Sequence, residues 1–472
     1  MTSAVRGSLP AFALLVAASG PFVVFERASA RGTLEVADFG WFVAWIAVAL
    51  ASLECASTIS HAGGPYVWGR VALASGWGFI WAWWRMLAAL FSVAVLGQAV
   101  GAVAIQVVGA PTSVRDFAPA VVIVAAGLAL VAWPPSIWPL SVAGVVATAG
   151  PACIAFLLPP DQSADALFRV VVSEEYVGLR LGVVGAIVAL QGADTAAVCV
   201  REVVGGRRAV ARGSVIGAGV FGVISLGPTV LASSGLQLDV AGGLSYPHFA
   251  RLAELIGVAV QGAIGIGISA RMLGAMARDH YLPEAFAAGG DGRPSRLSVI
   301  VAVAGAGIAS FLAPSDTGAA FASACAASLV TLGAALIVLR TAHPMTRRDY
   351  GVPGGTQAVA LCAAVAVTGG AFLLVDGVAN MGLRWAVGAG LLWMSGPCAW
   401  VALTISVKRG RPNRPIPLEM SDRWFDLARP GTPELAGPVT VGVPFDYRVM
   451  MIVPSGAPRP NPNQPVAPVS AA

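Results

Sequence analysis

The chain has 472 residues, of which 57% are hydrophobic and only 11% are charged, and its formal net charge is +5. Soluble domains carry about 25% charged residues, so this composition excludes a cytosolic enzyme and indicates a protein with many membrane spans. The basic residues lie in the loops between apolar runs and not on one face. This pattern argues against nucleic acid as a partner and makes the lipid bilayer the expected surroundings.

Twelve apolar runs are long enough to cross a bilayer, which takes about 17–25 residues. The predicted spans are 9–27, 37–59, 77–108, 117–133, 136–158, 181–200, 213–235, 249–276, 297–313, 319–340, 357–376 and 383–406. The third is long enough for a strongly tilted helix, and only Pro134-Pro135 separates the fourth from the fifth. The sequence therefore predicts an all-α polytopic membrane protein.

Lysine and arginine favour cytoplasmic loops. If the N-terminus is cytoplasmic, the inside loops hold sixteen of these residues and the outside loops six. We therefore expect a multi-pass protein of the plasma membrane with both termini in the cytoplasm. Thirteen of the 32 prolines lie between Pro412 and Pro468, a composition typical of disorder. We expect a transmembrane domain over residues 1–409 and a disordered cytoplasmic tail over 410–472.

The first span contains Ala17-Ala18-Ser19-Gly20-Pro21-Phe22 in its middle. Pro21 lacks an N–H and excludes the carbonyl four residues back, and Gly20 permits torsions that a helix does not use. Such a break is tolerated only where protein or a cavity covers it. On this segment alone, an ordinary proline kink and a binding site remain comparable interpretations.

The sixth span is interrupted in a similar way by Leu190-Gln191-Gly192-Ala193-Asp194-Thr195. A carboxylate at this depth costs about 2.5–3.5 kcal/mol on insertion scales, so Asp194 is a candidate functional group. Interruptions five spans apart are typical of a five-plus-five inverted repeat, in which broken helices 1 and 6 face each other at the midplane. Two unrelated kinks remain the alternative.

Other polar residues also fall inside the predicted spans. Glu54 in the second span could face a cavity or bond to a neighbouring helix. Arg85 follows Trp81-Ala82-Trp83-Trp84, and we expect it to extend to the membrane interface while the tryptophans form an aromatic belt. Gln261 and Ser269 lie in a glycine-rich part of the eighth span.

The sequence shows no enzyme or metal constellation. The six cysteines lie in apolar segments without paired spacing, and the four histidines lie in or beside different loops. No Gly-rich phosphate loop with its lysine is present. We therefore expect neither an enzyme nor a bound metal or other cofactor.

Several of these stretches resemble the amino acid–polyamine–organocation (APC) superfamily of permeases, particularly its polyamine-uptake and L-type amino acid transporter branch. The stretches that carry the resemblance are Ser19-Gly20-Pro21-Phe22, Glu54 with Gly63-Gly64-Pro65-Tyr66-Val67-Trp68, Asp194 to Glu202, Ser269 to Pro283 and Leu339 to Gly355. The resemblance implies the twelve-helix inverted-repeat fold, with substrate held between broken helices 1 and 6. Freed amides of the first helix would then bind a carboxylate, and carbonyls and the carboxylate of the sixth would bind an ammonium. The implied substrate-binding residues are Ala18, Ser19, Gly20, Pro21, Phe22, Gln191, Gly192 and Asp194.

Two departures from the family pattern bear on substrate and coupling. The aromatic residue before the sixth-helix aspartate is replaced by Ala193, and Ser92 stands where polyamine-uptake members commonly have an aspartate. The second change makes a polycation less expected as the substrate, without excluding it. Ser269 could belong to a sodium site but lacks a second hydroxyl, so we expect proton coupling with Glu54 or Asp194 as the carrier.

The sequence thus favours a secondary active transporter that moves a small-molecule substrate, an amino acid or a polyamine, by alternating access. The alternative is a non-transporting nutrient sensor of the same fold that signals through its tail. Nothing in the sequence indicates an accessory subunit.

Overall fold

The computed structural model describes residues 11–20, 36–59, 63–73, 75–108, 117–132, 141–149, 192–199, 206–233, 247–278, 281–287, 294–341 and 350–410. These residues form helices and connecting turns, and none of them forms a strand. The labelled helices are α2 (Val36–Thr58), α3 (Pro65–Ala72), α4 (Ser75–Val108), α5 (Ala118–Ala132), α9 (Thr195–Val198), α10 (Gly206–Ser233), α11 (Pro247–Arg278), η3 (Glu284–Phe286), α12 (Arg296–Ala309), α13 (Pro314–Thr341) and α14 (Gly355–Gly410). Helical residues also occupy Ala11–Gly20 and 141–149.

The predicted all-α membrane architecture is confirmed. Each of the twelve predicted spans overlaps helical residues in the described part of the chain. Within that part, four helices are long and apolar enough to cross a membrane, and six shorter apolar helices accompany them. Pro134-Pro135, the predicted boundary between the fourth and fifth spans, and the tail beyond Gly410 lie outside the described residues.

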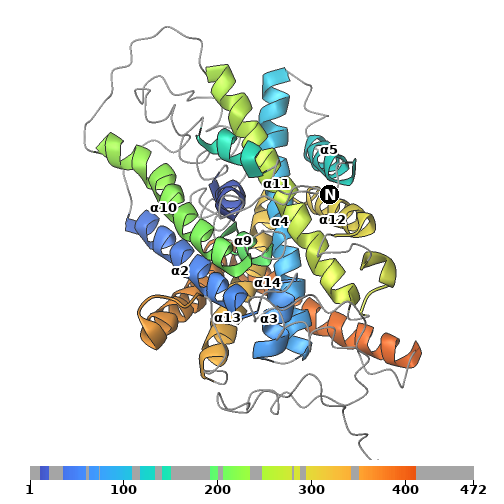
Figure 1. The fold of residues 1–472 in the computed structure, drawn as a ribbon. Helices are drawn as coiled ribbons and strands as arrows, with labels where there is room; N and C mark the ends of the chain where they lie inside the picture. Colours follow the sequence, from blue (N-terminus) through green and yellow to red (C-terminus); the bar gives the residue numbers. More distant parts are fainter. Residues whose placement is uncertain are drawn as a thin grey trace, which may run out of the picture.

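The long helix α4 lies in the middle of the bundle (Figure 1). Its 34 residues measure about 51 Å at 1.5 Å per residue, well beyond the roughly 30 Å of hydrocarbon in a bilayer. It packs against α3, α5, α11, α13 and α14. A side chain near the middle of α4 is therefore surrounded by other helices.

Glycines set two changes of chain direction. Gly63 and Gly64 have φ angles of 130° and 38°, which residues with a side chain rarely adopt. Pro65 then occupies the first turn of α3, where its missing N–H is tolerated. In α14, Gly382 has φ 70° and ψ −157°, so the helix is kinked between the two last predicted spans. Figure 1 shows the two halves of α14, orange and red-orange, on opposite sides of the bundle.

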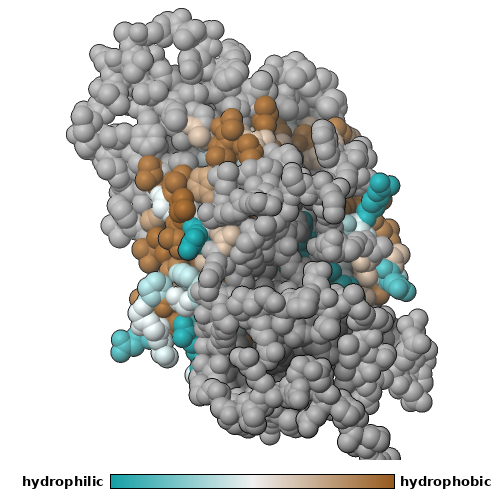
Figure 2. All heavy atoms as spheres, in the orientation of Figure 1, coloured by the Kyte–Doolittle hydropathy of each residue, from teal (hydrophilic) through white to brown (hydrophobic). Residues whose placement is uncertain are grey.

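The outer faces of the bundle are apolar. Val215, Ile216 and Val223 of α10 are exposed, as is Val43 of the neighbouring α2. Figure 2 shows brown apolar side chains over the region where Figure 1 places α10. An apolar exterior around a packed interior fits a protein surrounded by lipid.

Candidate functional site

The C-terminal end of the first described helix is held by polar groups from two other helices. The Ala18 carbonyl accepts a 2.6 Å hydrogen bond from Nε2 of Gln261 in α11. The Ser19 hydroxyl accepts one of 3.2 Å from the indole N–H of Trp45 in α2. Ala18 and Ser19 are buried. The backbone at the predicted break is therefore positioned by specific side chains, whereas Pro21 and Phe22 lie outside the described residues.

Gly192 brings the sixth predicted span directly against this helix end. A Cβ atom at Gly192 would collide with the Ser19 hydroxyl and the Ala18 carbonyl, so only glycine permits this approach. Gly20 in turn lies against Thr148, where an added Cβ would come within 2.7 Å of the side-chain methyl group. The structure thus brings together Ala18, Ser19 and Gly192 from two stretches far apart in sequence. Gln191 lies outside the described residues.

Asp194 lies two residues after Gly192 in the chain. It is the N-cap residue of the short helix α9, which is only 4 residues long. Its carboxylate binds Arg85 of α4 through two parallel bonds: Nε donates to Oδ2 at 2.7 Å and Nη2 donates to Oδ1 at 2.6 Å. Both residues are buried, Arg85 at 3% and Asp194 at 7% exposure. This bidentate geometry is the strong, directional form of an arginine–carboxylate pair.

The predicted interfacial role of Arg85 is wrong. Arg85 lies ten residues after the start of α4, roughly 15 Å along the helix axis, where it is buried and bound to Asp194. The aromatic belt is also wrong, because the indole N–H groups bond to other helices. Trp81 donates to Ser328 at 3.0 Å, Trp83 to Ser395 at 2.9 Å and Trp84 to the Trp393 carbonyl at 3.1 Å.

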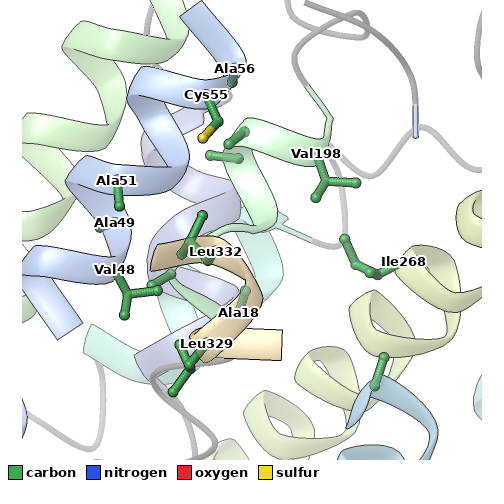
Figure 3. Packing of buried hydrophobic residues seen from close by; sticks show 14 of the residues in the cluster. Ala18, Val48, Ala49, Ala51, Cys55, Ala56, Val198, Ile268, Leu329 and Leu332 are labelled. Carbon is green, nitrogen blue, oxygen red and sulfur yellow. The ribbon is translucent and has the colours of Figure 1, made fainter. Parts of the chain in front are cut away.

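A small cavity borders the Arg85–Asp194 pair. Its lining residues are Val48, Ser52, Trp68, Trp81, Arg85, Ala88, Asp194, Cys325, Ser328, Leu329 and Leu332. Figure 3 shows Val48, Leu329 and Leu332 among the packed side chains close to Ala18. The cavity volume is about 20 Å³, enough for about one water molecule. The buried Ser52 hydroxyl has no hydrogen-bond partner among the described residues.

Glu54, the other predicted carrier, is 1% exposed, lies four residues before the end of α2 and bonds to a neighbouring helix and loop. Arg340 of α13 places Nε 2.5 Å from Oε1 and donates from Nη2 to Oε2 at 2.8 Å. The Val352 amide donates to Oε2 at 3.0 Å. Nearby, the Ser57 hydroxyl donates to the Tyr350 carbonyl at 2.6 Å, and partial burial raises the pKa of the Tyr350 phenol. We call Glu54, Arg340 and Val352 the latch.

Ser269 uses its hydroxyl inside its own helix. It is fully buried in α11 and donates to the Gly265 carbonyl at 3.1 Å. This bond to the preceding turn is the usual way in which a helical serine satisfies its hydroxyl.

A family model described as amino acid permease matches residues 11–382. The chain belongs to the amino acid permease family. This family is part of the APC superfamily that the sequence motifs resemble. Comparison with curated protein sequences finds no significant match.

A solved structure with a TM-score of 0.50 supports this helical fold for the permease. The permease is similar to a crystal structure of a mutant manganese transporter of Eremococcus coleocola, with a TM-score of 0.50 and 12% identity over 86% of this chain and 95% of that chain. The same transporter in complex with an aromatic bis-isothiourea substituted compound has a TM-score of 0.48 and 12% identity, over 85% and 94% of the two chains. At this identity the likeness shows the fold alone.

Sequence reasoning missed the arginine in the permease's site. The tryptophans before Arg85 favoured the interface, and its position ten residues into a 34-residue helix did not by itself decide between the interface and a buried partner. Ser52, Trp81 and Ser328 carried no signal, because their place beside Asp194 depends on how α2, α4 and α13 pack.

Proposed function

We propose that the permease is a proton-coupled secondary active transporter that moves amino acids or polyamines across the plasma membrane by alternating access. The observation that carries this proposal is the meeting of Ala18, Ser19 and Gly192, two residues before the buried Asp194 in the chain. Membership of the amino acid permease family supports transport as the activity. From the manganese transporters we take only the fold.

In this proposal the substrate binds between the first helix and the Gly192–Asp194 turn. Backbone amides around Ser19, Gly20 and Phe22 would bind a carboxylate, and the carbonyls of Gln191 and Gly192 with the Asp194 carboxylate would bind an ammonium. Ala18 and Pro21 would complete this set of substrate-binding residues. A cavity of about 20 Å³ is too small for such a substrate, so the helices must separate to admit it. Alternating access consists of movements of this kind.

Three buried groups are the proposed coupling residues: Glu54, Asp194 and Ser269. Asp194 is the one that lines the cavity, so a proton bound there would compete directly with the cations that the carboxylate can bind. Glu54 is bonded to Arg340 and the Val352 amide, so a proton at this position would act by loosening the latch.

Uptake by the full-length permease in proteoliposomes tests the function. Labelled leucine, arginine, putrescine and spermidine are offered with and without an inward pH gradient. Manganese uptake is measured in parallel. We expect uptake of at least one of the four organic compounds, increased by the gradient. Uptake of none of them would defeat the substrate class. Deleting residues 410–472 should leave the flux intact in a transporter.

Asp194→Asn tests the site itself. Loss of the charge should raise the substrate Kd of the folded protein at least about tenfold, and the unpaired Arg85 should lower its thermal stability. The matched control is Asp316→Asn, which removes the exposed ion pair with Arg384 and should leave Kd unchanged. An unchanged Kd with poor folding of Asp194→Asn would place Asp194 in a structural role.

A further inference from the structure

The carboxylate proposed to bind a substrate ammonium already binds a cation from the chain itself. Arg85 holds both Asp194 oxygens, at 2.7 and 2.6 Å, and both residues are buried. A substrate cation can reach these oxygens only if the guanidinium gives them up. Substrate binding at Asp194 is therefore an exchange of partners.

The displaced guanidinium stays charged, because arginine is not deprotonated in proteins. The cavity beside it is walled by Val48, Leu329 and Leu332 together with tryptophan rings. Asp194 is the only acidic residue that lines this cavity in the described part of the chain. A buried arginine without an anion is strongly disfavoured, so the anion that replaces Asp194 has to arrive with the substrate.

We infer that Arg85 is a specificity-determining residue that, together with the amides of the first helix, binds the carboxylate of a zwitterionic substrate and rejects polycations. A zwitterion exchanges one buried ion pair for two, Arg85 with its carboxylate and Asp194 with its ammonium, and leaves the site neutral. The fork of the guanidinium suits two carboxylate oxygens at once. The Ser52 hydroxyl, without a partner among the described residues, and the Ser328 hydroxyl line the same cavity and add neutral polar contacts.

A polyamine meets the opposite situation. Its first ammonium would displace Arg85, and the site would then hold at least two cations against one carboxylate. Like charges held close together in a buried site disfavour binding. This inference rests on the proposed function and narrows its substrate class from amino acids or polyamines to zwitterions.

The test compares compounds that differ only in the carboxylate. Binding of leucine, leucinamide, arginine, argininamide and putrescine is measured on the purified full-length permease, wild type, Arg85→Gln and Arg85→Lys. For the wild type, at least one amino acid should bind about tenfold or more tighter than its amide and than putrescine. Arg85→Gln should reduce this ratio by about tenfold or more, with putrescine binding more tightly than before. Arg85→Lys keeps the charge and should retain the wild-type order.

The ratio of the affinities for amino acid and amide is measured within one protein preparation, so partial misfolding of a variant does not alter this ratio. Equal affinity of the wild type for amino acid and amide, or tighter binding of putrescine, would overturn the inference while leaving the proposed function standing. A purely structural arginine would affect both compounds alike. If Arg85→Gln weakens the binding of amino acid and amide equally, the inference is therefore overturned as well. If Arg85→Gln does not fold, the wild-type and Arg85→Lys comparisons decide. If no compound is taken up and none binds, the proposed function itself is wrong.

Discussion

The described part of the permease contains two buried carboxylates, each paired with an arginine, and their surroundings differ. Asp194 precedes a helix of 4 residues, borders a cavity and has both oxygens bound by one side chain, Arg85. Glu54 lies inside the 23-residue helix α2 and is bound by the Arg340 side chain and also by the Val352 backbone amide.

This difference separates an exchangeable pair from a fixed one. In the proposed exchange Arg85 would leave Asp194 by a movement of its side chain alone, and the cavity that both residues line also contains the Ser52 hydroxyl. The Val352 amide cannot leave Glu54 unless the chain after α13 moves. Glu54 therefore joins α2 to that segment, and Asp194 is the carboxylate placed to change partners.

The largest expected effect comes from removing one arginine. Arg85→Leu leaves Asp194 buried without its cation and should cost about 3–5 kcal/mol of stability, measured as loss of thermal stability in detergent. Arg340→Leu should cost less, because the Arg340 side chain is 18% exposed and water can reach the site. The double variant Arg85→Leu/Asp194→Asn should recover much of the loss. Equal losses for both arginines would remove the distinction between the two pairs.

Next in size is the contact that brings the first and sixth spans together. Gly192→Ala forces a methyl group against Ser19 and the Ala18 carbonyl, an overpacking that should cost about 1–3 kcal/mol and reduce uptake. Gly262→Ala in α11 is the matched control, because an added Cβ there meets nothing within 4 Å. Equal behaviour of the two variants in uptake and thermal stability would contradict the close approach at Gly192.

An effect of similar size is expected at the latch. Glu54→Gln removes the charge and keeps an oxygen for the Val352 amide, so it should cost about 1.5–3 kcal/mol, as for hydrogen bonds to charged groups. The cost should appear as faster proteolysis between α13 and α14. If Glu54 carries the coupled proton, uptake by this variant should also lose its dependence on the pH gradient. An unchanged cleavage rate would show that Glu54 does not hold this segment.

The smallest effect is expected from two serines of α2. Ser57→Ala removes the bond to the Tyr350 carbonyl and should cost about 0.5–1.5 kcal/mol. Ser52→Ala removes a hydroxyl that has no partner among the described residues, so thermal stability should stay equal or rise slightly. A rise in the substrate KM of Ser52→Ala, with Ser57→Ala as control, would indicate that this hydroxyl serves the substrate.

The helices could be predicted because hydrocarbon imposes a local rule. Every run of about 20 apolar residues must satisfy its backbone internally, which makes it helical wherever it later packs. The kink at Gly382 illustrates this point, since it lies in the predicted gap between 357–376 and 383–406. The Gly63-Gly64-Pro65 turn also depends on local sequence, because residues with a side chain rarely adopt the φ angles of its glycines.

The sequence by itself determined where the helices lie, which family the motifs resemble and that Asp194 needs a partner at depth. Only the tertiary structure decided what that partner is. Arg85 and Asp194 are 109 positions apart, and nothing local to either residue distinguishes a buried guanidinium from one that reaches the interface. The distinction depends on which helices surround α4, because a charge that cannot reach water must be neutralised by whatever side chain packing brings to it.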